Sequence, residues 1–203
     1  MARKMDETVT RLTLPFRRAT SDDASHMAEL VNIAGDGLPL YLWGKLARPG
    51  QSAWDVGRER ARLGLGGFAY HNTVVREENG KVAACLIGYP LADGPQSLGA
   101  DALAPLAPLN QLQAIVPSSW YVNTLATYAE HRGKGFANEL LRVAEMLASD
   151  SHIDNMSLIA SDANAGARRL YEKNGYVEHA TRPMVKEDWQ HTGRNWVLVI
   201  KKT

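Results

Sequence analysis

Hydrophobic residues recur with the period of an α-helix in the stretch that ends at Asp150. One stripe and its flank are formed by Phe136, Leu140, Ala144 and Leu147, with Ala137, Leu141 and Ala148 beside them. A spacing of about 3.6 residues is typical of an amphipathic helix. The pattern therefore predicts a helix from about Lys134 to Asp150, with its apolar face against a core.

Further helices are predicted where capping residues or breaker glycines border shorter amphipathic runs. Ser21 is a candidate N-cap for a helix that reaches about Ile33, and the acidic pair that follows it suits the helix dipole. Residues 38–47 form a short amphipathic run, and Ser52 is a candidate cap for a helix over 52–66. The run 164–176 ends in an Asn-Gly pair that suits a left-handed C-cap.

Strands are predicted from runs rich in β-branched and aromatic residues. The clearest signal is residues 72–91, where two such runs meet at Asn79-Gly80, a pair typical of a tight hairpin turn. The other predicted strands lie at 13–20, 120–127, 155–160, 176–185 and 195–202. Helices between strands predict a mixed α/β sheet.

Composition narrows the class of protein without naming a function. A chain of 203 residues suits one domain, over 1–203, and its net charge of +1 gives no general case for nucleic acid or a membrane. The N-terminus lacks an apolar stretch of signal-peptide length, so we expect a cytoplasmic protein. The one cysteine, Cys85, stands in an apolar run, which favours a buried thiol, and no zinc-type spacing is present. We therefore expect no metal site.

Two long segments, at about 36–67 and 93–118, interrupt the regular elements. The second is rich in Pro, Gly and Ala and carries few charges. Long connections of this kind are often functional. Both segments are candidates for the walls of a binding site. We expect the second to control which ligand is accepted, so substitutions at Leu109 and Leu112 should change the affinity for that ligand.

The stretch EHRGKGFANELL, residues 130–141, places two glycines directly before the first predicted helix. Unpaired N–H groups at a helix N-terminus bind anions, and glycine lets a ligand approach the backbone. The spacing excludes a P-loop and a dinucleotide fingerprint. A plain strand-to-helix turn would explain the glycines on their own.

With its flanks, this stretch resembles the acyl-CoA-binding motif of the GNAT superfamily of N-acetyltransferases, [QR]-x-x-G-x-[GA], here Arg132 to Ala137. The run 164–176 resembles the second signature of the family, and the resemblance is densest from about Tyr121 to Tyr176. Two departures are Ala129, where the family often has proline, and Thr127, where an aliphatic residue is common. Both lie where the contribution is made by backbone.

The resemblance implies an α/β protein of the α+β type, with a mixed, mostly antiparallel sheet of about seven strands, splayed at its centre and flanked by helices. It implies an acyltransferase that moves acetyl from acetyl-CoA, as cosubstrate, to an amine. Thr127 matches the position of a bulge whose N–H faces the thioester oxygen, and Tyr171 matches the acid that protonates the leaving thiolate. The coenzyme-binding positions would be Leu125, Ala126, Thr127, Arg132, Gly133, Lys134, Gly135, Phe136, Ala137, Asn164, Ala167 and Tyr171.

Several alternatives stay open at this point. Tyr171 could be a core aromatic, Asn164 a simple helix cap, and Arg132 a solvated charge. No residue stands out as the general base, which leaves a water relay or a carboxylate from the first insert: Asp36, Asp55 or Glu59. The acceptor could be a small-molecule amine, which the apolar second insert favours, or a protein N-terminus or lysine. A non-catalytic CoA-binding module and a homodimer are also compatible with the sequence.

Overall fold

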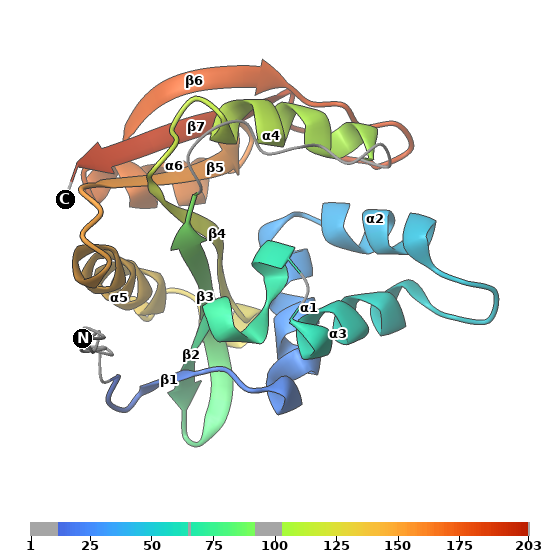
Figure 1. The fold of residues 1–203 in the computed structure, drawn as a ribbon, viewed down its shortest axis with the longest axis horizontal. Helices are drawn as coiled ribbons and strands as arrows, with labels where there is room; N and C mark the ends of the chain where they lie inside the picture. Colours follow the sequence, from blue (N-terminus) through green and yellow to red (C-terminus); the bar gives the residue numbers. More distant parts are fainter. Residues whose placement is uncertain (1–11, 65, 92–102, 203) are drawn as a thin grey trace, which may run out of the picture.

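A seven-stranded sheet organises the computed structural model, which describes residues 12–64, 66–91 and 103–202 (Figure 1). Its strands follow the order β1-β2-β3-β4-β5-β7-β6, in which only β4 and β5 run parallel. The strands are β1 (Phe16–Arg18), β2 (Thr73–Glu78), β3 (Lys81–Pro90), β4 (Trp120–Thr127), β5 (Asn155–Ser161), β6 (Val177–Pro183) and β7 (Asn195–Lys202). The prediction of a mixed, mostly antiparallel sheet of about seven strands is confirmed.

The predicted hairpin is β2–β3, and its turn residues explain its geometry. Asn79 and Gly80 have φ values of 52° and 73°, which are the left-handed conformations that a tight hairpin turn requires. The buried cysteine of β3, Cys85, pairs with Val75 and is fully buried. Burial raises the pKa of its thiol to about 12, so this cysteine is an inert core residue, as predicted.

The parallel pair β4–β5 separates after a short contact. Residues Trp120–Val122 pair with Met156–Leu158, and the pairing then stops although both strands continue. On its other side β4 remains paired to β3, with a register irregularity between Ile87 and Gly88 that leaves Asn123 without an opposite residue. The sheet therefore opens a gap at its centre, as expected from the resemblance.

Helices cover both faces of the sheet (Figure 1). On one face α5 (Phe136–Asp150) and α6 (Ala165–Lys173) pack into the largest apolar cluster, which includes the fully buried Leu140 and Leu141. On the other face lies α1 (Ala24–Ala34), with α2 (Leu38–Leu46) and α3 (Ala53–Leu63) packed beside it. The predicted helix boundaries agree with these elements within a few residues.

The first helix begins later than predicted, because a short 3-10 turn, Ser21–Asp23, precedes it and Thr20, not Ser21, is the N-cap of that turn. Thr20 has an extended backbone, and it forms a reciprocal capping box with Asp23 across this turn. The Asp23 carboxylate also accepts two bonds from the Arg17 guanidinium, at 2.7 and 2.9 Å. The ion pair holds Asp23 inward, which fixes the cap one residue earlier.

A short helix in the second insert, α4 (Ala107–Gln113), was not predicted from the sequence. It packs on β6 and β7 (Figure 1), and its Leu112 is fully buried in a cluster with Trp189 and Trp196. Leu109 is partly buried against the same cluster, so both leucines pack inside the fold, and their control of ligand choice stays a prediction. Residues 93–102 of this insert lie outside the described part of the chain.

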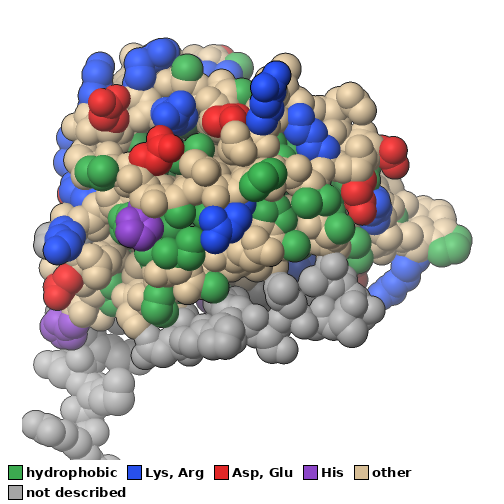
Figure 2. Space-filling view, turned by 90° about the horizontal axis from the view of Figure 1, so that it is seen from above, with side chains coloured by type: hydrophobic (Ala, Val, Ile, Leu, Met, Phe, Trp, Pro, Cys, Tyr) green, Lys and Arg blue, Asp and Glu red, His purple; other side chains and the backbone are tan. Residues whose placement is uncertain are grey.

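The surface carries charge of both signs. Figure 2 shows Lys and Arg side chains interspersed with Asp and Glu on the face seen from above. Within the residues that the structure describes, no helix combines the length and the apolar character that a membrane crossing needs.

Candidate active site

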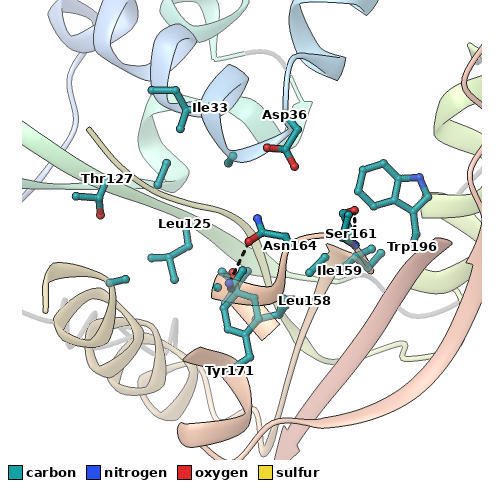
Figure 3. Close-up of a pocket in the computed structure, with 18 of the residues that line it drawn as sticks. Ile33, Asp36, Leu125, Thr127, Leu158, Ile159, Ser161, Asn164, Tyr171 and Trp196 are labelled. Carbon is teal, nitrogen blue, oxygen red and sulfur yellow. Dashed lines mark hydrogen bonds between the residues drawn. The ribbon is translucent and has the colours of Figure 1, made fainter. Parts of the chain in front are cut away.

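A pocket of about 760 Å³ opens where β4 and β5 separate (Figure 3). Its walls come from β4, β5, the ends of α1, α5 and α6, and the segment between β6 and β7. Of the predicted site residues, the ones that line it are Leu125, Ala126, Thr127, Arg132, Ala137, Asn164, Ala167 and Tyr171. We call the part beside Thr127, Arg132 and Ala137 the glycine-loop end, and the part beside Asp36, His191 and Trp196 the Asp36 end.

The glycine-loop end is built from backbone. Gly133 and Gly135 have φ values of 77° and 86°, and a Cβ placed on either residue would have no heavy atom within 4 Å. Gly135 is the N-cap of α5 and provides no side-chain cap, so the N–H groups of the first helical turn have no intrahelical partner. Such a cradle, open and lined with N–H donors, fits a phosphate group.

The side chains of this loop divide into two groups. Arg132 is exposed, lines the pocket, and donates its Nε–H to the carbonyl oxygen of Thr127 at 3.3 Å. Gly133, Lys134, Gly135 and Phe136 do not line it. The Lys134 Nζ lies 3.4 Å from His131 Nδ1, and the buried Phe136 ring packs under the Arg76 guanidinium. Phe136 therefore offers only its backbone to a ligand.

Strand β4 turns part of its backbone toward the gap. Tyr128 donates its N–H to the Ala83 carbonyl of β3 at 3.0 Å. Because successive N–H groups of a strand point to opposite sides, the N–H of Thr127 faces away from β3, toward the pocket. The expected bulge, however, is not at Thr127: the register irregularity lies four residues earlier, at Asn123, which also lines the pocket.

Tyr171 lies at the floor of the pocket, where Figure 3 shows its ring rising from α6. It is 8% exposed and belongs to the main apolar cluster, with its ring edge-to-face against Tyr176 at 5.9 Å. Burial raises the pKa of its hydroxyl to about 12, so the phenol keeps its proton at neutral pH. Tyr171 is thus a core aromatic and a pocket residue at once.

Asn164 caps a helix and also lines the pocket. Its Oδ1 accepts the Ala167 N–H at 3.0 Å and caps α6. Within the described residues its Nδ2 has no protein partner, and Figure 3 shows the side chain inside the pocket. The cap fixes the side chain, and the amide N–H₂ remains available to a ligand.

The Asp36 end contains residues that the sequence did not single out. His191 and Trp196 come from the β6–β7 segment and the start of β7, and they line the pocket at the same end as Asp36. Asp36 was one of three candidate carboxylates; Asp55 and Glu59 lie on α3 and do not line the pocket. The polar and aromatic run WQHTG, 189–193, between the last two strands was the available signal.

Metal ligands do not gather in this region. Among the residues that the structure describes, no group of three or more His, Cys, Asp or Glu side chains could hold a metal ion.

A mixed sheet split at its parallel pair, with a glycine loop at the N-terminus of a long helix, is the architecture of an acyltransferase. The chain belongs to the acetyltransferase (GNAT) family, whose model matches residues 42–176. A search of curated proteins finds no match.

Solved structures share the fold at low sequence identity. The N-acetyltransferase from Staphylococcus aureus Mu50 is 24% identical, with a TM-score of 0.64 over 91% of this chain and 98% of that chain. The polyamine N-acetyltransferase of Drosophila melanogaster, which catalyses the formation of N-acetylagmatine, is 15% identical, with a TM-score of 0.64 over 93% and 99%. The NatC complex, solved with Gag peptide and CoA, is 15% identical, with a TM-score of 0.54 over 93% and 97%.

Proposed function

We propose that this acetyltransferase transfers the acetyl group of acetyl-CoA directly to the primary amine of a small molecule. The observation that carries the proposal is the glycine loop, which presents the unpaired N–H groups of α5 beside a pocket that also contains the buried Tyr171 hydroxyl. One end of the site suits phosphate, and its middle holds a proton donor.

The residues at the glycine-loop end would hold the coenzyme. The N–H groups from Gly133 to Ala137 would bind its pyrophosphate, and the Arg132 guanidinium would add positive charge; the Arg132 N–H itself donates to the Ala129 carbonyl at 3.3 Å. The gap-facing backbone of Leu125 and Thr127 binds the amide-rich arm as an added strand, and the Asn164 Nδ2 group donates to the same arm. When bound, acetyl-CoA supplies the acetyl group as a reactive thioester.

Two groups of the chain act on the charges of the reaction. A strand N–H directed at the acyl oxygen stabilises the negative charge that develops there, a contribution of roughly 3 kcal/mol. Thr127 is the position that matches the family, and we infer that the bulge at Asn123 offers a second N–H for this role. The Tyr171 hydroxyl donates a proton to the departing sulfur, which its raised pKa of about 12 allows.

A small acceptor is supported by the closure of the Asp36 end. The β6–β7 segment is bonded to the α1–α2 region at several points: Trp189 Nε1 donates to the Asp36 carbonyl at 3.1 Å, and Tyr41 donates to Glu187 at 2.9 Å. Lys45 also pairs with Glu187. These bonds close one side of the pocket, and an extended peptide would need that side to be open.

A screen of primary amines tests the proposal. Purified protein is incubated with acetyl-CoA and individual amines, thiol release is followed, and products are identified by mass spectrometry. We expect thiol release that depends on the amine and an N-acetylated small molecule as product. Calorimetry with CoA alone measures coenzyme binding separately.

The outcomes separate the alternatives. Acetylation of peptide N-termini or lysines, with no small amine accepted, would move the assignment to a protein acetyltransferase. Coenzyme binding without transfer to any acceptor would favour a CoA-binding module. Failure to bind CoA would remove the assignment of the glycine loop.

A further inference from the structure

The carboxylate of Asp36 is held in place by a segment far away in the sequence. Its Oδ2 lies 3.2 Å from His191 Nε2, across 155 residues of chain. Its backbone has a φ of 49° and accepts the Trp189 Nε1–H at 3.1 Å through the carbonyl oxygen. The β6–β7 segment therefore fixes both the backbone and the side chain of this one residue.

His191 is oriented so that its proton points to that carboxylate. The Gly193 N–H donates to His191 Nδ1 at 2.9 Å, so Nδ1 acts as the acceptor and the ring proton lies on Nε2, facing Asp36. The imidazole side chain is 8% exposed and stacks on Trp189 at 4.6 Å between ring centroids. In this tautomer the pair keeps the negative charge of the carboxylate.

Close packing around the imidazole explains why this orientation is stable. A Cβ at Gly193 would lie 2.7 Å from His191 Cε1 and 2.4 Å from Ser161 Oγ, so any larger residue there would displace one of these side chains. The nearby cation Lys186 donates its Nζ to the His191 carbonyl oxygen at 2.6 Å, which leaves the Asp36 carboxylate to the histidine. A carboxylate whose orientation is fixed by hydrogen bonds and packing in this way is well suited to binding a cationic group of a ligand.

One side of the Asp36 carboxylate remains open. The side chain is 43% exposed, it lines the pocket, and within the described residues its Oδ1 has no protein partner. Figure 3 shows Asp36 and Asn164 facing each other across the open space. Arg132 also lines the pocket, and its guanidinium belongs to the glycine-loop end. The pocket thus has a cationic end and an anionic end.

We infer that the Asp36 carboxylate, positioned by His191, binds the ammonium group of the acceptor amine and selects charged acceptors over neutral ones. Before transfer the bound ammonium releases one proton through the carboxylate to solvent. The neutral amine then attacks the thioester carbonyl and loses its second proton as the C–S bond breaks and the departing thiolate is protonated. This inference rests on the proposed transfer to an amine and adds a substrate class to it. An ammonium group placed at Oδ1 forms a charge-assisted hydrogen bond, and an uncharged nucleophile of the same shape does not. The competing explanation is that the Asp36–His191 hydrogen bond is a latch: it only joins the turn after α1 to the β6–β7 segment and takes no part in binding.

Matched acceptor pairs test charge recognition directly. In butylamine and O-propylhydroxylamine, and in phenethylamine and O-benzylhydroxylamine, one CH₂ is exchanged for oxygen, so only the first member of each pair is charged at neutral pH. Dissociation constants are measured by NMR titration of CoA-saturated protein, and kcat/KM is measured in parallel. We expect the dissociation constant of the wild-type protein for the charged member to be lower than that for the neutral member by about tenfold or more.

Three variants isolate the groups involved. Asp36→Asn keeps the size of the side chain and should abolish the preference for the charged member of each pair. Asp188→Asn makes the same charge change at an exposed residue of the β6–β7 segment that does not line the pocket. This variant should retain the preference for the charged member. His191→Phe keeps a ring to stack on Trp189 but lacks the donor, so it should reduce the preference while changing the affinity for the neutral member little.

Each outcome decides the question. Loss of the preference in Asp36→Asn with its retention in Asp188→Asn supports the inference. A wild-type protein without a preference, or one whose preference survives Asp36→Asn, overturns it and leaves Asp36 as a latch. Equal losses for both members in His191→Phe would exclude a positioning role for the histidine. If CoA binding or acetyl transfer is absent altogether, the proposed function fails first, which is a different result.

Discussion

The glycine-loop end of the pocket lies beside a loop whose shape is set by the backbone of consecutive residues, whereas the Asp36 end is lined by side chains from segments 155 residues apart. Gly133 and Gly135 shape the first end through their φ values, with no side chain of their own. His191 shapes the second end through two hydrogen bonds and a stacked ring. The glycine-loop end is formed by the local backbone conformation of a few consecutive residues. The Asp36 end forms only when the complete fold brings distant segments together.

This difference matches the chemistry that each end would perform. A phosphate is recognised by N–H groups that every residue carries, so glycine spacing alone is enough to build the site. An acceptor amine is recognised by a particular charge in a particular place, and the fold brings that charge from a turn after α1. One coenzyme can thus be combined with varied acceptors by changing the second end only.

The largest effect is expected from a side chain in the glycine cradle. Gly135→Val should weaken CoA binding by about 10³-fold, because the branched side chain keeps phosphate from the N–H groups and costs two or more charge-assisted bonds. Calorimetry measures the loss. Gly50→Val is the matched control, since Gly50 has a φ of 82°, would have no heavy atom within 4 Å of an added Cβ, and lies in the connection between α2 and α3 rather than at the start of α5.

The two variants should lose similar amounts of stability, because both force a β-branched residue into a left-handed conformation. The comparison then isolates the ligand effect from the strain. A folded Gly135→Val protein that binds CoA with wild-type affinity would show that the pyrophosphate lies elsewhere.

The next largest effect is expected on stability, from the apolar cluster that supports the Asp36 end of the pocket. Leu112→Ala removes a fully buried side chain from the cluster that contains Trp189 and Trp196, and should lower the free energy of unfolding by about 3 kcal/mol. Leu63→Ala is the control, because that leucine is 60% exposed and the same substitution should cost little. Thermal or urea unfolding measures both.

The same variant tests what the second insert does. We expect the KM for acetyl-CoA to stay unchanged in the folded fraction of Leu112→Ala. An altered KM for the amine with an unchanged melting temperature would support the sequence-based idea that this segment is a direct acceptor wall.

The contrast between the two ends of the pocket also explains which parts of the fold and the site could be predicted from the sequence. The strands, the hairpin at Asn79-Gly80 and every α-helix except α4 follow from local periodicity and turn chemistry, and the motif residues from Arg132 to Ala137 follow from local spacing. The Asp36–His191 pair and the burial of Leu112 depend on the order β5-β7-β6, which no local pattern encodes. The expected position of the bulge, Thr127, was wrong for the same reason: pairing with β3 places the bulge at Asn123, and no local pattern encodes that pairing.

Tyr171 lies between the two ends, and its hydroxyl is the next test. Tyr171→Phe keeps the ring and should lower kcat by about 10²-fold, with little change in the KM for acetyl-CoA. Tyr176→Phe is the control, because Tyr176 is buried against Tyr171 and its hydroxyl bonds Met156 Sδ outside the pocket. It should change stability modestly and leave kcat near the wild-type value.

The pH dependence sharpens this test. Burial raises the pKa of Tyr171 to about 12, so the protonated acid persists to that pH and no Tyr171-dependent fall in rate is expected near pH 10. The rates of Tyr171→Phe should therefore run below those of the wild-type protein by a constant factor from pH 7 to about pH 10. A kcat for Tyr171→Phe within about threefold of wild type would leave Tyr171 as a packing residue.

The smallest effect separates two cations of the glycine loop that look equivalent in the sequence. Arg132 and Lys134 are both exposed, but only Arg132 lines the pocket, and its Nε bonds the Thr127 carbonyl beside the proposed coenzyme path. Arg132→Gln should raise the dissociation constant for CoA by about tenfold, with a weaker effect at high salt. Lys134→Gln should change it by less than about threefold, as a solvated charge does. Calorimetry at two salt concentrations measures both variants. Equal effects would mean that the loop acts on the coenzyme as a general positive charge, and the distinction between its side chains would then disappear.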